Sequence, residues 1–368
     1  MSSSKKDWLE WLDARLNLAE IFSVLSIMGI VYGEVDTRKG IRHALKEAFY
    51  KPIESYLRWP HILGILVLLL FIIEIITGVL LSFYYQPTTA SAFESVRFIV
   101  RDVSFGWLIH NIHRWAGYLI IIILVLRIIR LYYHGAYKSP RELLWVISIL
   151  LLWGSLKACF TGNLLPWDQY SYWSVVRGLD WIGKFPFLRE VKNYLFGSSL
   201  ISEAALIRFY FFHIAILPAF ILFLLFLNFS VIRKVGLSHL PGEGDTPKKP
   251  LYPHYYFNLL IVILLMTGIL ITLATLAPAH LYGKADPANT FAGIPPPWYM
   301  LWLYGIFEAL PRAPGIILVL VFLCGLLLCP FIDRSPAKPV KKRLFALALM
   351  ILILILIIMF SYIGFLRK

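Results

Sequence analysis

Seven apolar stretches, each long enough to cross the hydrocarbon core of a membrane, constrain this chain more than any other feature. A spanning helix needs about 20 apolar residues. Charged residues make up only 15% of the chain, against roughly 25% in a soluble domain. We therefore expect an all-α transmembrane fold with seven membrane spans. The stretches cover residues 61–84, 107–133, 143–161, 204–231, 256–277, 314–332 and 343–365.

Breaker residues divide the chain into four parts. Residues 236–254 are rich in glycine and proline and are predicted to form a linker. The linker separates a four-helix part, residues 59–235, from a three-helix part, residues 255–368. Residues 1–58 hold no full span, and hydrophobic residues at helical spacing near their start predict an amphipathic helix on the inner membrane face.

Positive charge is unevenly shared between the two sides of the membrane. With the N-terminus inside, the inner segments hold twenty Lys and Arg residues and the outer segments ten. Such a bias predicts the N-terminus on the inner, negative (n) side and the C-terminus on the outer, positive (p) side. The net charge of +14 is explained in the same way, so no nucleic-acid partner is expected.

The three cysteines exclude several kinds of cofactor site. Cys159, Cys324 and Cys329 lie in apolar runs without a C-x-x-C or C-x-x-C-H motif. The sequence therefore predicts neither a covalently attached haem nor a zinc ribbon in this chain.

Two histidines are the strongest candidates for chemistry. His113 and His213 each lie inside a predicted span that enters from the p side, at similar depth. Facing imidazoles inside a helical bundle suit axial ligation of a haem iron. The alternative is a hydrogen-bonded pair of core histidines.

Motifs around these histidines form a recognisable set, which resembles cytochrome b of the quinol-oxidising cytochrome bc complexes over residues 59–330. The photosynthetic split form is most similar, because it divides into a four-helix and a three-helix chain where this chain has its linker. The motifs are Thr77-Gly78, Phe83-Tyr84-Tyr85-Gln86-Pro87-Thr88, Phe105-Gly106-Trp107-Leu108-Ile109, His113-Arg114-Trp115, Ser139-Pro140-Arg141-Glu142-Leu143, Leu165-Pro166-Trp167-Asp168-Gln169, Arg208-Phe209-Tyr210 and Trp298-Tyr299.

The resemblance implies roles for residues near the histidines. Gly64, Gly78 and Gly117 would let a haem press against the helix backbone, although glycines in apolar helices also serve close helix packing. Arg114 and Arg208 would neutralise the haem propionates, or else extend to the interface as ordinary charged side chains.

The sequence departs from the family on the n side. A second histidine pair, fourteen or fifteen residues after the first, binds another haem in the family; here these positions hold Arg127 and Asn228. Neither is a usual haem ligand, so we expect one haem b and no n-side haem in the usual pose. Arg127 is expected to extend to the interface or to pair with a lipid, a quinone oxygen or a carboxylate. A displaced haem on a histidine near the n side is an alternative; the candidates are His61, His134, His239 and His254.

Two further departures concern protons. The family's Pro-Glu-Trp-Tyr motif is replaced by Pro296, Pro297, Trp298 and Tyr299, so the glutamate thought to accept a quinol proton is missing. Glu308 or Asp286 could replace it.

The other departure is Glu74, where the family usually has glutamine. A carboxyl group at this depth is either part of a proton relay or a neutral packing group. The resemblance places a quinol pocket on the p side, between the haem, residues 162–176 and residues 278–313.

The function implied is that of an integral subunit of the prokaryotic inner membrane, within a quinol:cytochrome c oxidoreductase-type complex. Expected protein partners are a Rieske iron–sulfur protein, a c-type cytochrome with one or several haems, or both, together with a second copy of the chain. Expected small partners are membrane quinone or quinol and lipid. The alternative is a mainly structural membrane anchor whose redox role has decayed. A transporter is disfavoured, because no interrupted helix pair or inverted repeat is visible.

Overall fold

The structure is a computed structural model that describes residues 8–16, 18–19, 40–50, 52–54, 62–183, 189–190, 192–193, 201–235, 248–250, 253–289, 296–333, 335 and 342–366. Within these ranges, seven helices are long and apolar enough to cross a membrane. The prediction of seven spans is confirmed, with helix ends that differ from the apolar windows by a few residues. The spans are α5 (Leu63–Ser82), α7 (Gly106–Tyr133), α8 (Glu142–Leu164), Glu203–Val235 formed by α11, η3 and α12, α13 (His254–Leu276), α15 (Arg312–Ile332) and α16 (Leu344–Leu366).

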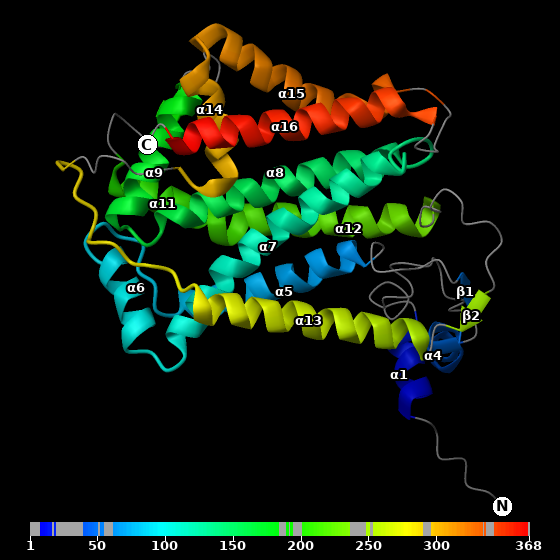
Figure 1. The fold of residues 1–368 in the computed structure, drawn as a ribbon. Coiled ribbons are helices and arrows are strands. Elements are labelled where there is room, and N and C mark those ends of the chain that lie inside the picture. Colours follow the sequence, from blue (N-terminus) through cyan, green and yellow to red (C-terminus); the bar gives the residue numbers. More distant parts are fainter. Residues whose placement is uncertain are drawn as a thin grey trace, which may run out of the picture.

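Shorter elements gather at the two ends of the bundle (Figure 1). The end that holds the C-terminus carries α6 (Ala92–Arg101), α9 (Gln169–Gly183) and α14 (Leu301–Ala309), which follows η4 (Trp298–Met300). The opposite end carries α1 (Trp8–Leu16), α4 (Ile41–Tyr50) and the antiparallel strands β1 (Pro52–Glu54) and β2 (Lys248–Pro250). The strands pair the segment before α5 with the segment before α13.

The main core lies where α5, α7, α8 and α12 (Leu217–Val235) pack together. Its fully buried members include Leu70, Leu124 and Leu151, one from each of three helices. α13 packs on α7 at the edge of this bundle, and α14, α15 and α16 form a separate apolar cluster. The confirmed architecture is thus a four-helix bundle joined to a three-helix C-terminal part.

The contact between α14 and α16 depends on two small residues. A Cβ atom added to Gly305 would collide with the carbonyl of Phe360, and one added to Gly364 would collide with the carbonyl of Leu301. Close backbone approach at glycine is a common way for helices to pack in a membrane, where van der Waals contact replaces the hydrophobic effect.

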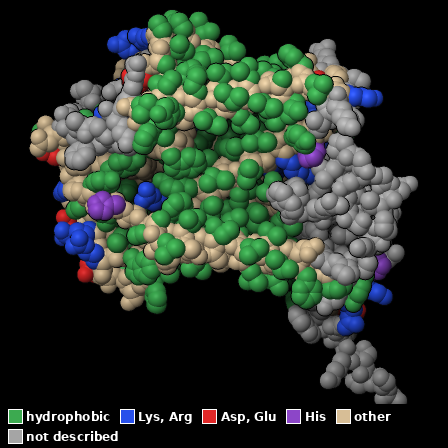
Figure 2. Space-filling model, in the orientation of Figure 1, with side chains coloured by type: hydrophobic (Ala, Val, Ile, Leu, Met, Phe, Trp, Pro, Cys, Tyr) green, Lys and Arg blue, Asp and Glu red, His purple; other side chains and the backbone are tan. Residues whose placement is uncertain are grey.

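The outer surface matches the expected membrane environment. Figure 2 shows hydrophobic side chains over the middle of the visible face, with charged side chains toward its two ends. Most side chains of α16 that point outward are large and apolar, among them Phe345, Ile351 and Ile358. Such a surface is stable only against lipid or another apolar surface.

Candidate functional site

The two candidate ligands face one another inside the four-helix bundle. The imidazole rings of His113 on α7 and His213 on η3 (Phe212–Ile216) lie 6.0 Å apart between centroids, with an interplanar angle of 78°. η3 is a single π-helical turn between α11 (Glu203–Phe211) and α12. Turns of this kind are frequent at functional sites because the extra residue redirects side chains. The structure therefore brings together the histidines that the sequence singled out.

His113 is held by the neighbouring helix α5. Its Nδ1 atom lies 2.9 Å from the hydroxyl oxygen of Thr77 and 2.9 Å from a carboxyl oxygen of Glu74. The Thr77 hydroxyl donates to the carbonyl of Ile73 at 2.6 Å. Because its hydrogen is used there, the Thr77 oxygen is an acceptor toward the imidazole. Nδ1 of His113 therefore carries the hydrogen, and Nε2 keeps a free lone pair.

His213 is held in the same way by α8. Its Nδ1 atom lies 3.1 Å from the carbonyl oxygen of Ala158 and 3.3 Å from the hydroxyl oxygen of Thr161. A carbonyl oxygen can only accept, so Nδ1 of His213 also carries the hydrogen. Both imidazoles thus present a free Nε2 lone pair, and outer partners fix both rings, which is the usual arrangement for metal-bound histidine.

The ligands available at the two rings suit a haem better than a bare metal ion. Two metal–nitrogen bonds of about 2 Å each are compatible with the 6.0 Å centroid separation. The described residues contain no group of three or more His, Cys, Asp or Glu side chains that could hold an ion. A metal held by two histidines therefore needs further ligands from a macrocycle.

Glycines keep the neighbouring helix surfaces flat beside the two rings. A Cβ atom at Gly78 would lie 3.3 Å from Cε1 of His113, and one at Gly162 would lie 2.6 Å from Cε1 of His213. Gly117 faces the sulfur of Cys159 and the carboxyl group of Glu74, each 3.3 Å from its added Cβ. The residues present therefore fit haem b, with Gly162 as a member that sequence reasoning missed.

Arg127 and Asn228, deeper in the bundle, form a different arrangement. The guanidinium of Arg127 donates to the side-chain oxygen of Asn228 at 2.5 Å, and both residues are buried. Gly64 lies against this pair, with its added Cβ 3.2 Å from Nη1 of Arg127. One expectation from the sequence, that Arg127 extends to the interface, is wrong. Its side chain is buried and turns inward to Asn228. Neither side chain offers a nitrogen lone pair for iron.

An aromatic cluster forms around Tyr118, which lies on α7 five residues after His113. The ring of Tyr118 contacts the rings of Trp298 and Tyr299, with centroids 5.8 and 6.2 Å apart. The guanidinium of Arg114 lies over the Tyr118 ring at 5.6 Å. Burial raises the pKa of Tyr299 well above its usual value, so its hydroxyl stays protonated near neutral pH and can donate a hydrogen bond.

Asp168 connects the segment that follows α8 to the segment that follows α13. Its carboxylate accepts hydrogen bonds from Ser171 at 2.8 Å and from the backbone N–H of Tyr282 at 3.0 Å. The backbones of Asp168 and Lys284 form an isolated antiparallel β-bridge, and the ring of Tyr170 stacks on that of Tyr282 at 5.4 Å. The segment after α8 and the segment after α13 are therefore fixed together beside the aromatic cluster.

The two carboxylates considered as substitutes for the missing glutamate have hydrogen-bond partners of their own. Asp286 accepts hydrogen bonds from its own loop, from the backbone N–H of Ala288 and the side chain of Asn289. Glu308 is hydrogen-bonded to Tyr304 and lies near Arg177. Pro296 and Pro297 lead into η4, and the side chains of Arg114 and Arg208 are exposed.

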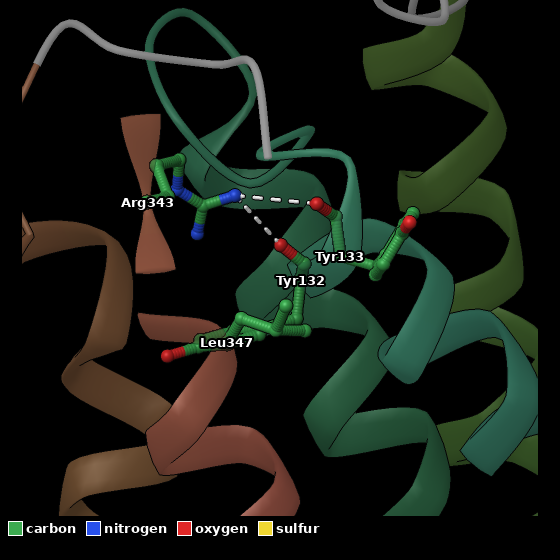
Figure 3. Close-up of a pocket in the computed structure, with 4 residues that line it drawn as sticks. All are labelled: Tyr132, Tyr133, Arg343 and Leu347. Carbon is green, nitrogen blue, oxygen red and sulfur yellow. Dashed lines mark hydrogen bonds between the residues drawn. The ribbon is translucent and has the colours of Figure 1, made fainter. Parts of the chain in front are cut away.

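A small pocket lies at the other end of α7, lined by Tyr132, Tyr133, Arg343 and Leu347 (Figure 3). Arg343 donates to the carbonyls of Tyr132 at 3.0 Å and Tyr133 at 3.4 Å, which are among the last carbonyls of the helix. The pocket is about 19 residues from His113, or roughly 29 Å along the helix. Its arginine ties the start of α16 to the end of α7, so we assign it a structural role.

Apart from Thr77, which belongs to the Thr77-Gly78 motif, several residues of the site have no signature in the sequence. Thr77 and Thr161 hold the two imidazoles from neighbouring helices, and Tyr118 connects the His113 helix to Trp298. The only local signal is position: Tyr118 lies one turn after Arg114, and Gly162 lies one residue after Thr161.

Comparisons with known proteins agree with this geometry. A family model described as Cytochrome b/b6/petB matches residues 49–236, and one described as Cytochrome b(C-terminal)/b6/petD matches residues 284–368. The chain is 30% identical to a cytochrome b of Allochromatium vinosum, over 93% of this chain and 84% of that protein. It is 41% identical to a cytochrome b6 of Heliomicrobium gestii, over 54% of this chain and 94% of that protein.

The fold also has a solved relative. A chain of a hyperthermophilic respiratory Complex III superposes with a TM-score of 0.79 and 24% sequence identity, covering 98% of this chain and 94% of that chain. At this identity the likeness concerns the fold.

Proposed function

Because the chain belongs to the cytochrome b/b6 family, we propose that it transfers electrons between membrane quinol and a partner redox subunit through a single haem b near the p side. The observation that carries this proposal is the facing pair His113 and His213, each with Nδ1 hydrogen-bonded to a neighbouring helix. When bound, haem b takes up and releases one electron at a time.

Each residue near the pair has a defined task in this proposal. His113 and His213 supply the two axial nitrogens, while Thr77 and Thr161 hold the rings in the ligating orientation. Gly78, Gly117 and Gly162 keep the helix surfaces free of side chains. Arg114 and Arg208 offer positive charge to the haem carboxylates on the p side.

The n-side position is proposed to lack a haem. Arg127 and Asn228 occupy the ligand positions and hydrogen-bond to each other. In the family the two irons are about fourteen helical residues apart, or roughly 21 Å. Without the second carrier, electrons leave on the p side or cross through a cofactor of a partner subunit.

The quinol pocket is proposed on the p side, beside Tyr118, Trp298 and Tyr299. Tyr299 donates a hydrogen bond to a quinol oxygen, since its raised pKa keeps the hydroxyl protonated. The aromatic rings and the anchored loops exclude water from the bound head group. Asp286 is hydrogen-bonded within its own loop and Glu308 is hydrogen-bonded to Tyr304, so proton release is expected to be slower than in relatives with the glutamate.

The pocket is tested by two substitutions and a control. We expect Trp298→Ala and Tyr299→Phe to lower quinol turnover about tenfold or more, because the head group loses its positioning contacts. Trp302→Phe is the matched control, since the Trp302 ring packs on Phe322 and not on Tyr118. Steady-state oxidation of a quinol analogue measures the effect. Unchanged turnover in both variants would place the pocket elsewhere.

The orientation of the chain follows from the loop charges. We propose that it is a multi-pass protein of a prokaryotic inner membrane with the N-terminus inside. Residues 1–58 then form an inner-face segment and residues 59–235 the haem domain. Residues 236–254 form the linker, and residues 255–368 form the quinol-site domain. A cysteine placed in 236–254 should react with an impermeant reagent from the n side. Labelling from the p side alone contradicts this orientation.

The proposed partners are a Rieske iron–sulfur protein, a c-type cytochrome or both, in a two-fold dimer within a quinol:cytochrome c oxidoreductase-type complex. The competing function is a structural anchor with decayed redox chemistry. Quantitation of non-covalent haem in the purified subunit, with a reduced-minus-oxidised spectrum, separates the two. One haem b per chain supports electron transfer, none supports the anchor, and a reproducible value of two rejects the single-haem proposal.

A further inference from the structure

The two candidate axial ligands differ in one respect. Each Nδ1 atom has a threonine hydroxyl as one partner, Thr77 for His113 and Thr161 for His213. The second partner of His213 is the neutral carbonyl of Ala158, whereas the second partner of His113 is the carboxyl group of Glu74. The pair is therefore symmetric except for a single carboxyl group.

Glu74 lies in a membrane span, where burial of a carboxyl group is energetically unfavourable. It is in the middle of α5, within a membrane span, and its side chain is 17% exposed. One oxygen contacts Nδ1 of His113 at 2.9 Å, and the other is buried without a hydrogen-bond partner near Gly117. Ionisable groups inside spans are rarely kept without a specific partner. The partner that this geometry supplies is His113.

We propose that Glu74 is a positioning and tuning residue that lowers the reduction potential of the p-side haem through its hydrogen bond with His113. The proposal rests on the function proposed above, because it requires a haem held by His113. It goes beyond that function, since it assigns the role of Glu74 to the iron and away from proton transfer or packing.

The physical reason lies in the basicity of the ligand. An Nδ1–H group that donates to a carboxyl oxygen makes the imidazole a stronger electron donor at Nε2. A stronger donor stabilises the oxidised iron relative to the reduced iron and so lowers the potential. A carboxyl partner acts more strongly than the neutral oxygens of Thr77, Thr161 or Ala158, because charge-assisted hydrogen bonds are stronger than neutral ones.

Redox potentiometry of the purified holoprotein tests the proposal with matched variants. Glu74→Gln keeps the shape and an acceptor oxygen but removes the carboxyl group, so we expect full haem content and a more positive midpoint potential. Glu74→Asp withdraws the carboxyl group from Nδ1, and its potential should move in the same direction by less. Thr77→Val and Thr161→Val each remove one neutral acceptor, and both should shift the potential less than Glu74→Gln.

The possible results distinguish a failure of this proposal from a failure of the function proposed above. A potential that Glu74→Gln and Glu74→Asp both leave unchanged, or a shift no larger than that of Thr77→Val, overturns the tuning role. If Glu74→Gln lost haem on purification, the comparison of Glu74→Asp with Thr77→Val would decide the matter. A wild-type chain without haem rejects the proposed function itself, before any variant is compared.

Discussion

Replacement of His113 or His213 by alanine is expected to abolish haem binding by the purified chain. Each imidazole supplies one axial bond, and the described residues contain no further cluster of metal ligands beside them. A methyl group offers no lone pair to the iron. The absorbance of the reduced haem should therefore fall to background in either variant, and extraction should give close to zero haem per chain.

His110→Ala is the control for this result. His110 lies on the same helix, three residues before His113, so its substitution tests for a general disturbance of α7. We expect it to keep one haem per chain. Full haem content in His113→Ala, with a normal spectrum, would mean that the iron is held by other residues and that the facing histidines are a structural pair.

The spans were predictable because their signal is local. A run of about 20 apolar residues forms a helix in a membrane whatever lies beside it, since every backbone group must be satisfied within the segment. The depth of His113 and His213 followed from counting residues along such helices. That the rings face each other 6.0 Å apart is seen only in the structure.

The outer partners of the histidines were not predictable in the same way. Thr77, Glu74 and Thr161 act across helix pairs, and their contacts depend on how each helix is rotated about its axis. The apolar pattern of a span does not fix that rotation, because nearly every face is hydrophobic. The β-bridge between the backbones of Asp168 and Lys284 is equally non-local.

The buried pair Arg127 and Asn228 gives the second large expected effect. Asn228→Leu leaves a buried guanidinium without its hydrogen-bond acceptor, which costs about 3 kcal/mol, the upper end of the range for an unsatisfied buried group, because the donor is charged. Arg127→Leu leaves an unpaired amide oxygen, at a cost of about 1–3 kcal/mol. Both single variants should therefore unfold at lower temperature than the wild type.

The double variant Arg127→Leu/Asn228→Leu distinguishes a coupled pair from two independent side chains. Replacing both partners of a buried hydrogen bond by apolar groups of similar size is often neutral or stabilising. We therefore expect the double variant to be more stable than Asn228→Leu and to keep the haem proposed at His113 and His213. Thermal unfolding in detergent, followed by circular dichroism alongside haem content, completes the double-mutant cycle. Additive losses would show that the 2.5 Å contact contributes nothing. Recovery of stability in the double variant would show that Arg127 and Asn228 serve each other and no external ligand. A residue that bound an external ligand would not regain its contribution to stability when its neighbour is removed.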